Sequence, residues 1–154
     1  MDTCYALERL MLETIPLARA MGLRVLEFDD NRLALSAPLA ANVNDKGCAF
    51  GGSLVSLMTL SCWGLTMLKL DEAGIKADVF VQDSEIRYLA PVWDELIAEA
   101  HLDSGQDWPG FIAQLKEKGK ARVTLHAEVT ALEGGGVACR FTGQFVAKRH
   151  GAKT

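Results

Sequence analysis

Apolar residues recur every three to four positions over residues 3–21, a spacing that predicts an amphipathic helix. Pro16 lacks the backbone N–H donor that a helix interior needs, so we expect it to kink or split this helix, and Gly22 is placed to end it. From residue 23 onward, apolar and polar residues alternate instead. This change of period predicts a β-hairpin whose strands are joined by a turn at residues 29–31.

Residues 51–70 are apolar on almost every side and predict one long helix. By length alone this segment could span a membrane. It is a single, central segment that contains serine and threonine, and no basic cluster beside it would fix an orientation in a bilayer. We therefore expect a helix buried on every side inside a protein core, and no membrane partner.

The rest of the chain is dominated by the alternation typical of strands. Strands are predicted at residues 76–88, 96–102, 121–131 and 137–147. We expect a bulge near Asp83, a short helix over residues 107–118, and a glycine turn at residues 134–136. Six strands and one apolar helix predict an α+β fold, in which an antiparallel six-stranded sheet wraps around the long central helix.

The length of 154 residues fits one domain, with an N-terminal helical segment over residues 1–22 and a tail over residues 149–154. Sixteen Lys and Arg residues stand against twenty Asp and Glu residues, for a net charge of -4. This balance argues against nucleic acid as a partner, because binding to phosphates needs an excess of basic side chains.

The four cysteines show no spacing typical of a metal site and do not cluster with the three histidines. The first 22 residues contain acidic side chains that a signal peptide would avoid. We therefore expect a cytoplasmic protein with reduced cysteines and no metal. Cys48 lies in a glycine-flanked loop and is a conceivable nucleophile, although no histidine near it in sequence would activate it.

The stretch from Asn44 to Ser53, NDKGCAFGGS, resembles the loop-to-helix signature of hotdog-fold acyl-thioester enzymes. The later stretch IRYLAPV, residues 86–92, resembles the strand motif of that family that ends in Tyr-x-x-Pro. Together with the order of elements, the resemblance covers roughly residues 20–148 and implies a hotdog fold. Phe50 stands where the family usually has His, and Thr59 stands where it usually has the catalytic Asp or Glu.

With these two departures, the chain resembles a narrower hotdog subgroup that also occurs C-terminal to an acetyltransferase domain. Its members are often described as thioesterases. Some are malonyl-acyl carrier protein decarboxylases that act at the start of fatty acid synthesis, and these use an Asn and a Thr or Ser in place of the carboxylate. The resemblance therefore implies that Asn44 and Thr59 are the catalytic residues.

Gly51 and Gly52 open the predicted long helix, whose first N–H groups have no acceptor within the helix. These donors and the helix dipole suit a thioester carbonyl that becomes an oxyanion or enolate. We expect Ser53 and Phe50 to line the same site, with Phe50 either along the acyl or pantetheine slot or simply packed on the helix start.

Three functions remain open. A malonyl-thioester decarboxylase needs no base, and the Asn44 amide and Thr59 hydroxyl could orient its substrate. A thioesterase needs a base to activate water, and Asp45 or Asp83 could supply it. A non-catalytic acyl-thioester binding module needs neither. The simpler roles are a hydroxyl bonded to its own helix for Thr59, loop capping for Asp45, and a bulge or dimer contact for Asp83, paired with Arg87.

The resemblance also implies a homodimer or a dimer of dimers with sites at the subunit interface. The substrate would be carried on the phosphopantetheine of acyl carrier protein or coenzyme A, and no further cofactor is implied. Two basic groups could meet an acidic carrier or a phosphate, although solvated surface lysines are the simpler explanation for any one of them. They are Lys116, Lys118, Lys120 and Arg122, and Lys148, Arg149, His150 and Lys153.

Overall fold

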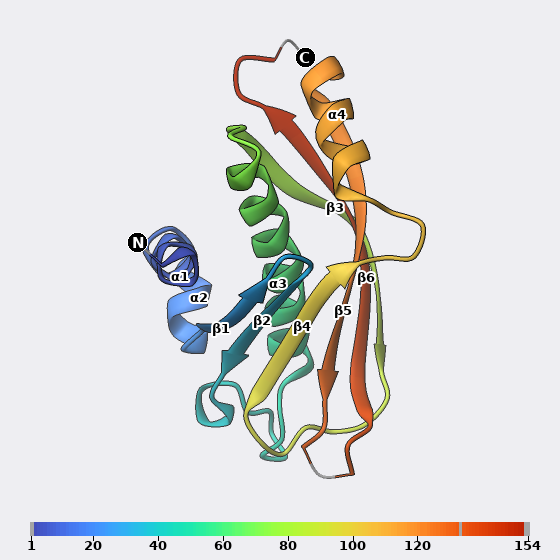
Figure 1. Ribbon diagram of the computed structural model, residues 1–154. Coiled ribbons are helices and arrows are strands. Elements are labelled where there is room, and N and C mark those ends of the chain that lie inside the picture. The colour runs from blue at the N-terminus through green and yellow to red at the C-terminus, as the bar shows by residue number, and fades with distance from the viewer. Residues whose placement is uncertain (1, 133, 153–154) are drawn as a thin grey trace.

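A computed structural model describes residues 2–132 and 134–152, so Lys153 and the end of the predicted tail lie outside the described residues (Figure 1). Six strands form one antiparallel sheet in the order β1-β2-β4-β5-β6-β3, and the long helix α3 lies along one face of it. The predicted α+β hotdog fold is confirmed. The strands are β1 (Arg24–Asp29), β2 (Arg32–Ala37), β3 (Ala77–Tyr88), β4 (Leu96–Leu102), β5 (Lys120–Thr130) and β6 (Val137–Arg149).

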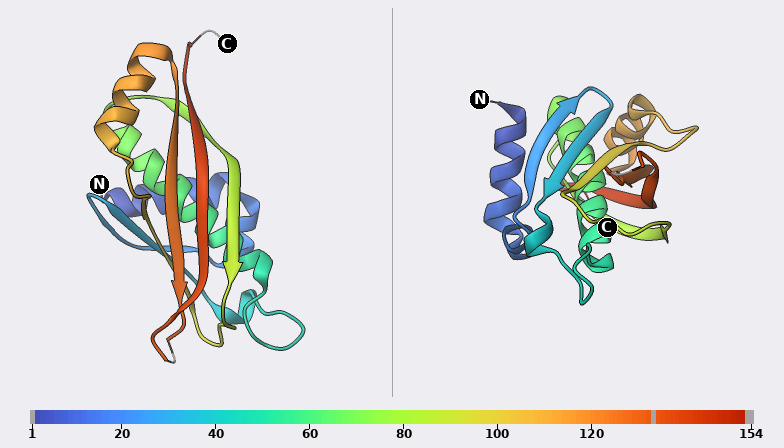
Figure 2. Two further views of the ribbon diagram at one scale, coloured as in Figure 1. Left: turned by 90° about the vertical axis from the view of Figure 1, so that its right-hand side faces the viewer. Right: turned by 90° about the horizontal axis from the view of Figure 1, so that it is seen from below.

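The N-terminal helix is split where the sequence predicts. Helix α1 (Thr3–Thr14) and helix α2 (Pro16–Met21) meet at Ile15, because Pro16 has no N–H to continue the first helix. Gly22 ends α2 with a φ of 71°, a left-handed conformation that glycine adopts without strain. The right view of Figure 2 shows both short helices beside β1, at one edge of the sheet.

Helix α3 (Gly51–Glu72) packs its apolar side onto the sheet, where residues such as Leu57, Met58 and Leu65 are fully buried. It is long and apolar enough to cross a membrane by length and composition, and burial against the sheet explains that character. The expectation of burial on every side is wrong. The sheet, α1 and α2 leave a half-buried stripe along α3, which is formed by Gly52, Ser56, Thr59 and Trp63.

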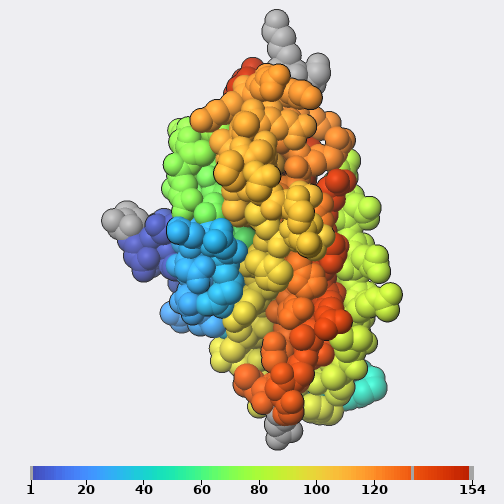
Figure 3. Space-filling view, turned by 45° about the vertical axis from the view of Figure 1, so that its right-hand side comes forward, coloured from blue at the N-terminus to red at the C-terminus, as the bar shows by residue number. Residues whose placement is uncertain are grey.

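The short helix α4 (Trp108–Lys118) also forms as predicted, capped by the Asp107 carboxylate, which accepts from the Gly110 N–H at 2.6 Å. It covers the ends of β5 and β6 that lie away from the loop before α3, as the left view of Figure 2 shows. The opposite face of β5, β6 and β3 carries no helix, and Figure 3 shows side chains of these strands forming that surface.

Strand β3 lies at an edge of the sheet and pairs only with β6. Its register against β6 shifts between Val81 and Asp83, which confirms the predicted bulge. The Arg87 guanidinium lies 3.9 Å from a Glu85 carboxylate oxygen. No ion pair joins Arg87 to Asp83 among the described residues, so the expected pairing is wrong.

Candidate functional site

The start of α3 presents backbone donors at its N-terminal end. Phe50 caps the helix with an extended backbone, and its carbonyl oxygen accepts from the N–H groups of Ser53 at 3.0 Å and Leu54 at 3.1 Å. Among the described residues, the N–H groups of Gly51 and Gly52 have no acceptor. They are free to bind a ligand oxygen, and the helix dipole adds to their preference for negative charge.

The Asn44 side chain is held in a fixed orientation in the loop before α3. Its Oδ1 accepts from the backbone N–H groups of Lys46 at 2.8 Å and Cys48 at 3.2 Å. Its Nδ2 donates to the Cys48 Sγ at 3.2 Å, which is a weak acceptor. The second Nδ2 hydrogen has no acceptor within the described residues. Cys48 itself is only 6% exposed, so it is poorly placed to act as a nucleophile.

Thr59 lies on the same stripe of α3 as Gly52 and Ser56, because residues three and seven positions apart share a helix face. Its hydroxyl donates to the Val55 carbonyl at 2.7 Å, the helix back-bond that was the simpler expectation. Within one chain, no hydrogen bond among the described residues joins Thr59 to Asn44.

No Asp, Glu, His, Lys or Arg occurs between Gly51 and Leu68. The one thiol in this part of α3, Cys62, is fully buried, and burial raises its pKa strongly. The half-buried stripe of α3 therefore carries hydroxyl groups and backbone donors but no side chain that could act as a base near neutral pH.

Tyr88 packs across the start of α3. A Cβ atom on Gly51 would lie 3.4 Å from the Tyr88 ring, and the Tyr88 hydroxyl donates to the Gly51 carbonyl at 3.4 Å. Partial burial raises the pKa of this phenol, so it stays protonated near neutral pH. The loop-to-helix signature does not include Tyr88, and the Tyr-x-x-Pro motif is the sequence signal that points to this residue.

Phe50 lies over the first turn of α3 and lines a hollow beside it. Its ring occupies the space that a side chain on Gly52 would need, because a Cβ there would lie 2.3 Å from a ring carbon. Phe50, Gly52, Ser53 and residues of α2 line a hollow of about 320 Å³. The structure thus places Phe50, Gly52 and Ser53 around one hollow.

The two alternative acids are both exposed to solvent. Asp45 has a side chain that is 80% exposed, and Lys46 pairs with it at 3.0 Å. Asp83 lies opposite Gln144 on the helix-free face of the sheet, because the neighbouring Phe145 is buried on the α3 side. There it lines a separate hollow of about 280 Å³ with Glu85 and Thr142.

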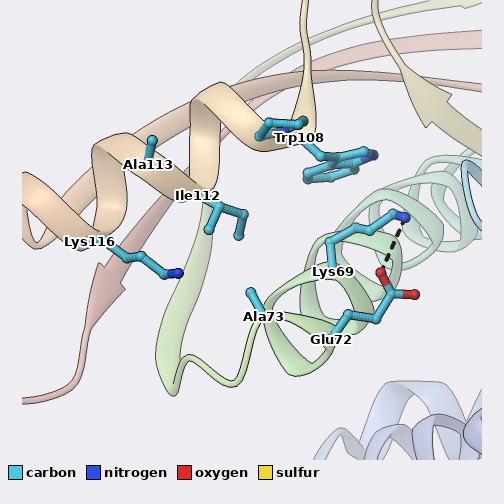
Figure 4. Close-up of a pocket in the computed structure, with 8 residues that line it drawn as sticks. Lys69, Glu72, Ala73, Trp108, Ile112, Ala113 and Lys116 are labelled. Atoms are coloured by element: carbon cyan, nitrogen blue, oxygen red, sulfur yellow. Dashed lines mark hydrogen bonds and ion pairs between the residues drawn. The ribbon is translucent and has the colours of Figure 1, made fainter.

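A hollow of about 490 Å³ lies between α4 and the C-terminal end of α3 (Figure 4). There Lys69 and Glu72 form an ion pair at 3.3 Å, beside Trp108 and Ile112. Eighteen residues of helix separate Gly51 from Lys69, which corresponds to about 27 Å. This hollow is therefore remote from the donors at the start of α3. In residues 2–132 and 134–152, no group of three or more His, Cys, Asp or Glu side chains could hold a metal ion.

A six-stranded sheet around one long helix, with a glycine pair at the helix start, defines a hotdog-fold protein of the thioesterase class. Residues 4–149 match the YiiD_C family, described as "Putative thioesterase (yiiD_Cterm)", and the chain belongs to this family.

Solved structures agree with this assignment. The chain is 30% identical to a protein of unknown function from Chlorobaculum tepidum, with a TM-score of 0.89 over 96% of this chain and 94% of that one. It is 29% identical to a "putative thioesterase" from Shewanella oneidensis, with a TM-score of 0.85 over 95% and 97% of the two chains. A "Probable Thioesterase" from Pseudomonas aeruginosa is 25% identical, with a TM-score of 0.81 over 97% of both chains.

Proposed function

We propose that this acyl-thioester enzyme decarboxylates a malonyl thioester carried on acyl carrier protein or coenzyme A. One combination of observations carries the proposal. The N–H groups of Gly51 and Gly52 have no acceptor among the described residues, and the half-buried stripe of α3 beside them has no side chain that could act as a base. Hydrolysis requires a base to activate water, whereas cleavage of the malonyl C–C bond does not. The positions of Asp45 and Asp83 add support, because the Asp45 side chain is 80% exposed and Asp83 lies on the helix-free face of the sheet.

Decarboxylation of a malonyl thioester can proceed with the groups near the start of α3 and water. The bond between the carboxylate carbon and the α-carbon breaks, carbon dioxide leaves, and the electron pair forms an enolate. The enolate oxygen accepts from the N–H groups of Gly51 and Gly52, and the α-carbon then takes a proton from water. The second Nδ2 hydrogen of Asn44 and the hydroxyl of Thr59 hold the departing carboxylate. A carboxylate is a stronger acceptor than the Val55 carbonyl that the Thr59 hydroxyl contacts in the structure.

A homodimer is part of the proposal, and the free edge of β3 is its basis. This strand has twelve residues and pairs with β6 alone, so its outer row of backbone groups has no strand partner among the described residues. Phe80 is 55% exposed and Val81 is 46% exposed on this edge. A long, partly apolar strand edge invites pairing with another chain, and a second copy of β3 would cover it. The stripe of α3 that holds Thr59 would then face an interface.

Replacing Val81 by Glu is expected to convert the dimer to a monomer, because pairing of the two β3 edges would take an unpaired carboxylate of each copy out of water. Sedimentation velocity at micromolar concentration measures the outcome. Leu26→Glu is the matched control, since Leu26 is 50% exposed on β1, at the opposite edge of the sheet. A monomeric native chain, or a Val81→Glu variant that sediments like the native one, would contradict the dimer.

The proposed activity is tested by incubating the purified protein with malonyl-acyl carrier protein and recording the intact carrier mass. We expect the mass to fall by one carbon dioxide, which leaves the acetyl carrier. Release of the bare thiol carrier would identify hydrolysis, which is the activity that the family description favours. An unchanged mass for the malonyl forms of both acyl carrier protein and coenzyme A would refute catalysis on malonyl thioesters and favour a binding module.

A further inference from the structure

The loop that carries Asn44 is closed by its own backbone. The Asn44 N–H donates to the Cys48 carbonyl at 2.7 Å, and the Gly47 N–H donates to the Asn44 carbonyl at 3.3 Å. Gly47 has a φ of 90°, a left-handed conformation that suits glycine in so tight a turn. The Ala49 N–H then donates to the Val92 carbonyl at 2.8 Å, which anchors the end of the loop. Asn44 and Cys48 therefore lie side by side on a fixed backbone.

Cys48 contacts the Asn44 side-chain amide at two points. Its N–H donates to the Asn44 Oδ1 at 3.2 Å, and its Sγ accepts from the Asn44 Nδ2 at 3.2 Å. Because the oxygen and the nitrogen of the amide both face one residue, the Nδ2 hydrogen that is donated is the one on the side of Oδ1. The other hydrogen, on the side of the Asn44 Cβ, has no acceptor among the described residues.

Three contacts together set the direction of this amide. Oδ1 also accepts from the Lys46 N–H at 2.8 Å, so a reversed amide would set its Nδ2 hydrogens against two N–H donors. These two backbone donors hold only the oxygen. The contact that holds the nitrogen is the one to the Cys48 Sγ, and this contact therefore fixes the direction of the free Nδ2 hydrogen.

Cys48 is buried without being part of the hydrophobic core. It is 6% exposed, as is its neighbour Ala49, but only Ala49 belongs to the cluster of buried apolar side chains around α3. Cys62 and Cys139, by contrast, are fully buried members of that cluster. Packing in the core accounts for those two thiols, whereas the Cys48 thiol has the Asn44 amide as its partner.

We propose that Cys48 is a positioning residue for Asn44, whose amide it holds so that one Nδ2 hydrogen points at the carboxylate of a malonyl thioester. The inference rests on the role of Asn44 in the proposed function. Cleavage of the C–C bond needs the carboxylate turned out of the thioester plane, so a donor with a fixed direction speeds it more than a donor that rotates. Cys48 itself does not touch the substrate.

Three variants test the contact. Cys48→Ala removes the sulfur but keeps both backbone donors to Oδ1, so we expect kcat for decarboxylation to fall by about tenfold, less than for loss of the whole amide. Cys48→Ser restores an acceptor on a shorter bond and should keep at least about a third of the native kcat. Cys4→Ala is the matched control, because Cys4 is a half-buried cysteine in α1, and it should leave kcat unchanged. Thermal unfolding checks that each variant is folded.

A double-mutant cycle separates positioning from a general loosening of the loop. A residue that acts through Asn44 has nothing to position once the amide is gone. We therefore expect Cys48→Ala to lower kcat in the native chain and to leave the residual kcat of Asn44→Ala unchanged. A merely structural role would lower kcat by the same factor in both backgrounds, and that result would overturn the inference.

The contact itself is measured by NMR without turnover. The chain has three asparagines, Asn31, Asn42 and Asn44, so Asn44→Asp identifies the side-chain amide signals of Asn44 by their absence. In the native chain we expect a nuclear Overhauser effect between the Cys48 β protons and the Nδ2 proton on the side of Oδ1. The other Nδ2 proton is recognised by its proximity to the Asn44 β protons. Cys48→Ala should shift the signal of the first proton, and Cys4→Ala should shift neither.

Equal kcat in the native chain and in a folded Cys48→Ala variant would overturn the inference, as would the absence of the expected nuclear Overhauser effect. The outcome is separable from that of the proposed reaction. If the native chain releases no carbon dioxide, the reaction and the positioning role in it are both rejected, even where NMR finds the contact. If carbon dioxide is released but the cycle shows equal losses in both backgrounds, the reaction stands and only the positioning role is rejected.

Discussion

Thr59→Val is expected to lower kcat for malonyl-thioester decarboxylation by on the order of 10²-fold, because the substrate carboxylate loses a donor that orients it for cleavage of the C–C bond. Valine keeps the shape of threonine and removes only the hydroxyl. The carbonyl that this hydroxyl contacts, that of Val55, keeps its helical bond from the Thr59 N–H, so stability should change little. Thr59→Ser restores the hydroxyl and should retain most of the activity.

Thr66→Val is the matched control for this experiment. Thr66 lies in the same helix and makes the same kind of back-bond, to the Cys62 carbonyl at 2.9 Å, but it is fully buried in the core. Its replacement should leave kcat unchanged. Rates are read from carrier mass or carbon dioxide release, and thermal unfolding checks the fold. A folded Thr59→Val variant that keeps more than a third of the native kcat would remove Thr59 from the mechanism.

The sequence predicts the elements well because each is specified by local periodicity. The alternation of Phe141 and Phe145 with Thr142 and Gln144 places the first pair inside and the second pair outside, as the structure has them. The split at Pro16 likewise follows from one missing N–H. Predictions of this kind need only the residues of one element.

Predictions of which side chains are buried or face a given side are less accurate where they depend on neighbouring elements. The apolar composition of α3 predicts burial on every side. Within one chain, the sheet covers one side of α3 and the two short helices cover only part of the other. The facing of Asp83 depends on the bulge after Val81, because one extra residue moves every later side chain of β3 to the opposite face. The bulge was predicted, but its position relative to Asp83 could not be fixed without the pairing to β6.

Two residues near the site were missed for a related reason. Tyr88 reaches Gly51 across 37 positions of sequence, a contact that the Tyr-x-x-Pro motif does not reveal by itself. Asn42 reads as an ordinary polar loop residue, and its importance comes from carbonyl groups at Met21 and Pro38 that only the fold brings to it. Candidates chosen from one motif thus omit the residues that other segments add to the same site.

Gly143→Ala is expected to destabilise the protein by about 1–3 kcal/mol, although removing a glycine from a strand ordinarily gains stability. Gly143 lies in β6 on the face covered by α3, between two buried phenyl rings. A Cβ there would lie 2.6 Å and 2.7 Å from ring carbons of Phe141 and 3.2 Å from one of Phe145. Both rings are at most 1% exposed, so neither can move aside without displacing the core.

Urea unfolding measures the expected loss, and two variants isolate its cause. Gly136→Ala is the matched control: a Cβ there meets no atom within 4 Å, so its stability should be unchanged or raised by up to about 1 kcal/mol. Combining Gly143→Ala with Phe141→Leu removes the ring that the new methyl group meets most closely, so the double variant should lose less stability than the two single losses added together. If Gly143→Ala were as stable as the native chain, the two rings could move apart to admit a methyl group. The packing of Phe141 and Phe145 beneath α3 would then not require glycine at position 143.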